Sequence, residues 1–160
     1  MSNILSPFST TKRAYNILLS MVSIVPILFT IYIFISLPKE GLIFSEFLSQ
    51  NVWNSILLLV ILIDLAWVYI LLKTYPEFEN ENGHEYTGFM LWILFLSQIV
   101  VTNILLAIIS GIVLYKLKVK FTEVAKLNIM IHNKWLTIMA LSLLLFSLLC
   151  GFALIRLNFS

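Results

Sequence analysis

Residues 53–72 read WNSILLLVILIDLAWVYILL, and this stretch decides the fold. It supplies the roughly 20 residues that an α-helix needs to cross about 30 Å of hydrocarbon. In lipid the backbone must satisfy its own hydrogen bonds, and an apolar stretch without strand-like alternation does so as a helix. The stretch therefore predicts a membrane-spanning helix with one acidic side chain, Asp64, inside it.

Three further apolar blocks of similar length flank this stretch, at residues 14–37, 89–115 and 135–157. Together the four blocks predict an all-α bundle of four transmembrane helices, a single membrane domain covering residues 1–160. The composition agrees, because 61% of the 160 residues are hydrophobic and 11% are charged, whereas a soluble domain carries about 25% charged residues. A soluble enzyme, a soluble nucleic-acid-binding protein and a disordered chain are excluded.

Aromatic residues mark the starts of the four predicted spans. They are Tyr15, Trp53, Trp92 and Trp135. Amphipathic rings prefer the headgroup region of a bilayer, so we expect these residues to be interfacial anchors.

Two polar segments of opposite charge connect the later spans. The acidic segment, residues 73–88, reads KTYPEFENENGHEYTG, and the basic segment, residues 116–134, reads KLKVKFTEVAKLNIMIHNK. Apolar residues recur at spacings of three and four in the basic segment, which predicts an extended amphipathic hairpin between the third and fourth spans. The expected contacts with a partner protein or with lipid are Lys116, Lys118, Lys120, Lys126, Glu77, Glu79, Glu81 and Glu85. The acidic residues lack the spacing of a calcium-binding loop, so no metal site is expected.

Asp64 is the only aspartate of the chain and the only charged residue deep inside a predicted span. It lies about 16 Å along the helix from Trp53, near the middle of the bilayer. A charge is costly there, so we expect Asp64 to face the bundle interior. The expected partners are polar side chains of neighbouring spans, Gln98 and Asn103 or Asn16 and Ser20. Two interpretations stay open: a carboxylate on a proton or ion pathway, and a neutral acid that ties helices together.

Small residues form stripes on the last two predicted spans. They are Ala107, Ser110 and Gly111 in the third span, and Ala140, Ser147 and Gly151 in the fourth. Small side chains let helix backbones approach closely, so we expect these stripes to pack helices and to offer surface for a homo-oligomer. A polar path along the third span is the functional alternative.

The orientation of a four-span bundle is contested by its charges. If both termini are cytoplasmic, that side holds four positive residues and the other side holds six. The count favours external termini, but Lys12 and Arg13 before the first span favour the opposite orientation, and first helices usually dominate. We favour a cytoplasmic basic segment.

No catalytic motif is present. The chain lacks an HExxH sequence, a cysteine pair and a glycine-rich phosphate loop, and its sole aspartate lies inside a span. We therefore expect a protein that is not an enzyme and uses no cofactor. Direct nucleic-acid binding is not expected either, since the few lysines also serve orientation.

The size, the four spans, the short polar loops and the missing catalytic set resemble small membrane proteins of bacterial defence and toxin-immunity loci. The layout is most similar to the membrane subunit of the Kiwa anti-phage system, with bacteriocin-immunity proteins as a second comparison. The Kiwa resemblance implies an oligomeric sensor in the bacterial inner membrane that holds a soluble partner. It assigns no role to any single residue.

Two classes of function follow from the sequence. The first is a non-catalytic membrane subunit that oligomerises and docks or senses a soluble partner protein. The alternative is a small proton- or ion-conducting channel or transporter, or a holin-like pore, that uses Asp64.

Overall fold

The structure is a computed structural model that describes residues 10–41, 43–79 and 84–158. These residues form eight α-helices and no strand, which confirms the predicted all-α class. The helices are α1 (Thr11–Glu40), α2 (Phe44–Gln50), α3 (Val52–Glu79), α4 (His84–Val100), α5 (Ile104–Leu117), α6 (Phe121–Val124), α7 (Leu127–His132) and α8 (Lys134–Asn158).

Three helices, α1, α3 and α8, are long and apolar enough to cross a membrane. They contain 30, 28 and 25 residues, and at about 1.5 Å per residue each is longer than a hydrocarbon core of about 30 Å. Large apolar side chains such as Phe34, Leu65 and Phe152 lie exposed on their outer faces. An apolar surface of this extent suits lipid rather than water, so the chain is a multi-pass integral membrane protein.

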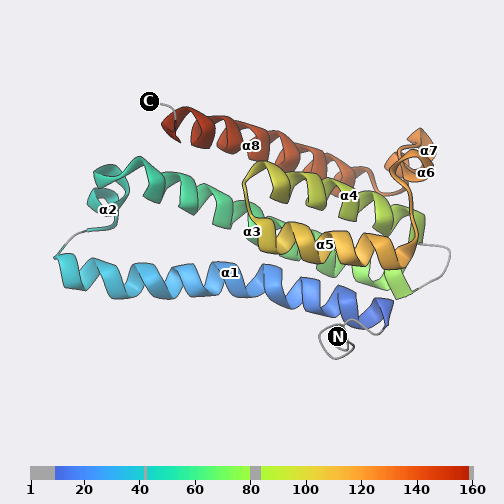
Figure 1. The fold of residues 1–160 in the computed structure, drawn as a ribbon, viewed down its shortest axis with the longest axis horizontal. Helices are drawn as coiled ribbons and strands as arrows, with labels where there is room; N and C mark the ends of the chain where they lie inside the picture. Colours follow the sequence, from blue (N-terminus) through green and yellow to red (C-terminus); the bar gives the residue numbers. More distant parts are fainter. Residues whose placement is uncertain (1–9, 42, 80–83, 159–160) are drawn as a thin grey trace.

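The predicted third span does not exist as a single helix. The chain turns back at residues 101–103, so α4 and α5 run antiparallel and side by side as a hairpin (Figure 1). Thr102 has a φ of 59°, which is the left-handed conformation that ends a helix. The backbone N–H of Asn103 donates to the carbonyl of Gln98 over 2.9 Å and closes the turn. The prediction of one span over residues 89–115 is therefore wrong, because an apolar run has the same local pattern whether it continues or folds back.

Packing explains why the chain folds back. Helix α4 lies between α3, α5 and α8, and it buries apolar residues such as Phe89, Met90 and Leu94 against them. A continuous helix would leave one face of α4 without the cover that α5 provides. The α4–α5 hairpin thus gives the bundle an inner helix.

The two polar segments are more helical than predicted. Helix α3 continues to Glu79 and α4 begins at His84, so most of the acidic segment is helical. The predicted extended hairpin after the third span is wrong as well. Helix α5 ends at Leu117 and is followed by the C-cap residue Lys118, whose φ is 55°. The short helices α6 and α7 then pack against α4. They do so because Val124 and Ile129 bury their side chains in the core.

Candidate functional site

Asp64 meets Gln98 inside the bundle. Both side chains are completely buried, and Nε2 of Gln98 in α4 donates a hydrogen bond of 2.8 Å to Oδ1 of Asp64 in α3. Asp64 lies in the middle of α3 on the same face as the buried Trp67, since residues three apart share a helical face. The expected interior position of Asp64 and its expected amide partner Gln98 are both confirmed.

The same two side chains carry oxygen atoms that bond to nothing in the described part of the chain. Oδ2 of Asp64 and Oε1 of Gln98 are buried without a hydrogen-bond partner. A buried polar atom left in this state costs about 1–3 kcal/mol. Both atoms are hydrogen-bond acceptors. A proton on the carboxyl group, or a small cation bound by the two oxygens, would therefore give them a partner. This pair is the candidate functional site.

A second set of buried bonds lies next to the pair. The indole Nε1 of Trp67 donates to Oγ of Ser97 over 3.4 Å, and Ser97 also bonds to Oγ of Ser147 in α8. Because Ser97 directly precedes Gln98, these bonds and the Asp64 contact tie α3, α4 and α8 together at one depth. The sequence did not single out Trp67, although it follows Asp64 by three residues and therefore shares its helical face.

The other expected partners of Asp64 lie elsewhere. Asn103 is the N-cap residue of α5 and lies in the hairpin turn. Asn16 and Ser20 are exposed on the outer face of α1. The alternative partners Asn16 and Ser20 are wrong, because α1 turns other residues, such as Tyr15 and Leu18, inward. Asn103 is joined to the site by its backbone N–H, which donates to the backbone carbonyl of Gln98.

The small-residue stripes pack helices within the chain. Ala107, Ser110, Ala140, Ser147 and Gly151 are all buried. The hairpin turn rests against α8 at Gly151, where an added Cβ would lie 2.6 Å from the carbonyl oxygen of Val100. At Gly111 an added Cβ would lie 3.4 Å from Phe95, which is ordinary contact. The packing role of the stripes is confirmed, and Gly151 is the position that leaves no room.

Tyr15 is not an interfacial anchor. Its side chain is completely buried, and its hydroxyl donates to the carbonyl of Leu71 over 2.7 Å. Its ring stacks on Phe78 at a centroid distance of 4.5 Å. The prediction failed because α3 extends beyond the expected span and covers the start of α1. Trp53 and Trp135 are exposed.

The charged residues of the acidic segment pair with other elements. Nζ of Lys12 lies 2.6 Å from Oε1 of Glu79, and this hydrogen bond raises the pKa of Lys12 and lowers the pKa of Glu79. Nε2 of His132 lies 3.3 Å from Oε2 of Glu77, within ion-pair distance but not aligned for a hydrogen bond. Of the remaining expected contact residues, Glu81 lies outside the described residues, Lys116 is half-buried, and the exposed ones are Glu85, Lys118, Lys120 and Lys126.

The α4–α5 hairpin decides which charged residues share an end of the bundle. Because the hairpin starts and finishes at the same end, α6, α7 and the start of α8 lie at the same end of the bundle as the start of α1 and the end of α3 (Figure 1). We call this end the basic end. It includes eight of the ten lysines and arginines: Lys12, Arg13, Lys73, Lys116, Lys118, Lys120, Lys126 and Lys134. The opposite end holds Lys39 and Arg156.

No family model, curated protein or solved structure matches this chain. Its function is therefore inferred from its own residues. The two features that bear on function are the Asp64–Gln98 pair in the interior and the concentration of positive charge at one end.

Proposed function

We propose that α1, α3 and α8 cross the membrane and that the α4–α5 hairpin enters it from the basic end and returns there. The distribution of positive charge, eight residues against two, supports this topology. The positive-inside rule then assigns the basic end to the cytoplasm, and Lys12 and Arg13 before the first span agree with that orientation. Four spans would place the N-terminus and the basic segment on opposite sides of the membrane, so the first-helix rule and the charge count favour opposite orientations. Three crossings place both on the same side, and the two criteria then agree.

Reporter fusions test the topology. We expect a reporter after Ser160 to be external, and reporters at the N-terminus and between α6 and α7 to be cytoplasmic. A phosphatase that is active only outside the cytoplasm and a fluorescent protein that folds only inside it give opposite readings at each position. A cytoplasmic signal after Ser160 together with a cytoplasmic N-terminus would contradict three crossings.

We infer further that the chain is a non-catalytic membrane subunit that docks a soluble protein at its cytoplasmic basic end. The observation that carries this proposal is the packing of α6 and α7 against α4, which holds exposed lysines on a fixed surface. The hydroxyl of Tyr86 donates to the carbonyl of Asn133 over 3.2 Å, and Val124 is completely buried. A surface held in this way presents one shape to a partner, which lowers the entropy cost of binding.

The Kiwa resemblance extends this proposal. It adds a homo-oligomer in the bacterial inner membrane that senses infection and holds its partner in the cytosol. Coexpression with the product of the adjacent gene, followed by purification in detergent, tests both parts. We expect the partner to co-elute with an oligomer of this chain.

A matched pair of charge reversals locates the docking surface. Lys126→Glu changes the exposed surface at the basic end, and Lys39→Glu makes the same charge change at the opposite end. We expect only Lys126→Glu to release the partner. A monodisperse monomer that retains no partner would count against the whole proposal.

A second candidate function is a proton or small-cation pathway through Asp64. The observation that favours it is the pair of buried, unpartnered oxygens, Oδ2 of Asp64 and Oε1 of Gln98. Ionisable groups inside a membrane commonly serve proton or ion movement. Ion flux into proteoliposomes measures it, and we expect Asp64→Asn to abolish the flux while leaving the oligomeric state unchanged. A holin-like pore that uses Asp64 predicts, in addition, growth arrest and membrane depolarisation on overexpression.

A further inference from the structure

The seam between α4 and α5 forms a groove on the outside of the bundle. Next to the basic end it is a cavity of about 480 Å³, and next to the hairpin turn it is a cavity of about 360 Å³. Phe95 and Gly111 line both cavities, so the two cavities adjoin along one seam, which we call the α4–α5 groove. This α4–α5 groove extends from Lys118 at the basic end to Thr102 at the turn.

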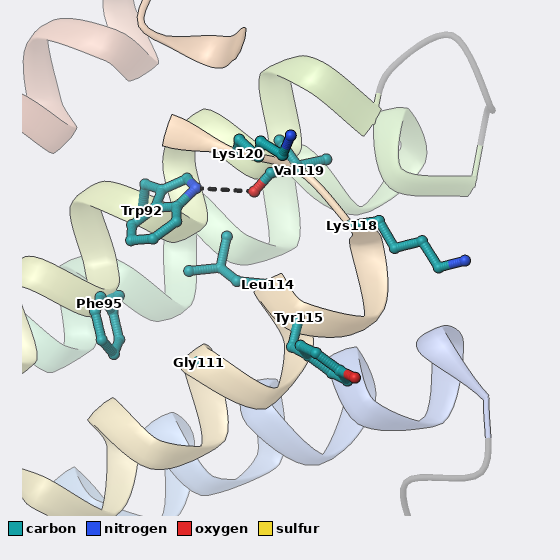
Figure 2. Close-up of a pocket in the computed structure, with 8 residues that line it drawn as sticks. All are labelled: Trp92, Phe95, Gly111, Leu114, Tyr115, Lys118, Val119 and Lys120. Carbon is teal, nitrogen blue, oxygen red and sulfur yellow. Dashed lines mark hydrogen bonds between the residues drawn. The ribbon is translucent and has the colours of Figure 1, made fainter. Parts of the chain in front are cut away.

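The middle of the α4–α5 groove is apolar and is kept open by a glycine. Trp92 and Phe95 of α4 face Gly111 and Leu114 of α5 (Figure 2). A Cβ at position 111 would only touch Phe95 at 3.4 Å, so a longer side chain there would fill the groove. An apolar, aromatic lining of this kind accommodates an alkyl chain.

The outer end of the α4–α5 groove is positively charged. Lys118 and Lys120 line the cavity there, and the Lys118 side chain extends beyond the end of α5 (Figure 2). The Tyr115 ring beside them is 84% exposed. Lys120 also lies 3.9 Å from Glu123, an exposed pair of the kind that contributes little and exchanges readily with other partners.

We propose that the α4–α5 groove binds one anionic phospholipid, with its phosphate at Lys118 and Lys120 and one acyl chain along Phe95 and Gly111. The groove has the length for it, because α5 extends about 21 Å and the hydrocarbon of one leaflet is about 15 Å deep. Positive charge at the headgroup level and an apolar floor below it match both parts of such a lipid. The inference rests on the proposed entry of the hairpin into the membrane from the basic end.

A second copy of the chain fits this groove less well. Copies in one membrane share an orientation, so an interface through the groove would bring two sets of Lys118 and Lys120 together. Like charges in contact oppose association, whereas an anionic headgroup neutralises them.

Tryptophan quenching by lipids with brominated acyl chains tests the proposal. The background variant Trp53→Phe/Trp135→Phe retains two tryptophans. Trp92 lines the groove, and Trp67 is completely buried. We expect brominated phosphatidylglycerol to quench Trp92 at a lower mole fraction than brominated phosphatidylcholine does. The blank is the same background with Trp92→Phe, which reports any quenching of Trp67.

Two variants separate the headgroup from the acyl chain. Lys118→Gln/Lys120→Gln is expected to lower the preference for phosphatidylglycerol by about fivefold for each lysine, whereas Lys126→Gln/Lys134→Gln, with the same net charge, leaves it unchanged. Gly111→Leu is expected to reduce quenching by both lipids, because leucine occupies the groove. Circular dichroism and the elution volume in detergent confirm that each variant is folded.

The outcomes distinguish this inference from the topology on which it rests. Equal quenching of Trp92 by the two lipids would mean a lipid-facing hairpin without a site, and would overturn the inference alone. Absence of quenching by either lipid would overturn the topology too. A change from monomer to oligomer that protects Trp92 from both lipids would make a second copy the occupant.

Discussion

Nε2 of Gln98 donates to Oδ1 of Asp64 over 2.8 Å, and this contact joins the middle of α3 to the last turn of α4. The backbone carbonyl oxygen of Gln98 also accepts a hydrogen bond of 2.9 Å from the backbone N–H of Asn103. Gln98 therefore connects the buried acid to the turn of the α4–α5 hairpin.

Asp64→Asn is expected to preserve or raise the stability of the bundle. An asparagine keeps one oxygen for Nε2 of Gln98 and adds an N–H₂ group that bonds to the unpartnered Oε1 of Gln98. Asp64→Leu leaves the whole Gln98 amide without a partner and is expected to cost about 1–3 kcal/mol. Thermal unfolding in detergent measures both variants. A similar loss of stability in both variants would mean that Asp64 acts through its charge.

Thr102→Gly is expected to raise stability by roughly 0.5–1 kcal/mol, because glycine adopts a positive φ without the cost that threonine bears. Thr102 has a φ of 59° in the hairpin turn. In a continuous helix the same substitution would instead lower stability by roughly 0.3 kcal/mol, the difference between the helix propensities of threonine and glycine. The sign of the change in melting temperature therefore distinguishes the hairpin from a single span. Ile108→Gly, inside α5, is the control and is expected to destabilise.

Gly151→Ala is expected to destabilise the bundle by roughly 1–3 kcal/mol, the usual cost of overpacking. The added methyl group would lie 2.6 Å from the carbonyl oxygen of Val100, and backbone cannot move aside cheaply. Gly111→Ala meets only Phe95 at 3.4 Å and is expected to be neutral or to gain up to about 1 kcal/mol from helix propensity. Unfolding of the two variants in the same detergent provides the comparison, and equal effects would contradict the contact between α8 and the turn.

The ion pair of Lys12 and Glu79 is expected to persist from the lowered pKa of Glu79 up to the raised pKa of Lys12. The pKa of Glu79 lies below its ordinary value of 4.5, so its contribution is present above that pH and is lost as pH falls through the lowered pKa. The pKa of Lys12 lies above 10.5, so its contribution is lost only as pH rises through the raised pKa. Lys12→Gln should return the pKa of Glu79 toward 4.5.

The carboxyl ¹³C chemical shift of Glu79, followed as a function of pH, measures that return. High salt should also raise the pKa of Glu79 toward its ordinary value in the unsubstituted protein, because salt screens exposed ion pairs. An identical titration of Glu79 with and without Lys12 would show that the contact at 2.6 Å does not persist in solution. Since both side chains are exposed, we expect little change in global stability.

Part of the candidate site could be predicted from the sequence. An acid in the middle of an apolar run has to find polar partners inside the bundle, and Gln98 was among the few available amides. Trp67 is also predictable, because it lies three residues after Asp64 on the same face of α3, and its indole Nε1 donates to Ser97, the residue before Gln98. Asn103 could not be placed, because its distance from Asp64 depends on a turn that carries neither glycine nor proline.

The sequence by itself determined the apolar helices, the membrane environment and the interior position of Asp64. These properties follow from hydropathy and helical period, which act residue by residue. Only the tertiary structure decided that residues 89–115 fold back on themselves, because a continuous helix and a hairpin share one local pattern. The choice depends on long-range packing, with Gly111 against Phe95 and Gly151 against Val100. That choice also places the basic segment at the same end of the bundle as the start of α1, so this one turn decides how the positive charge is divided between the two ends.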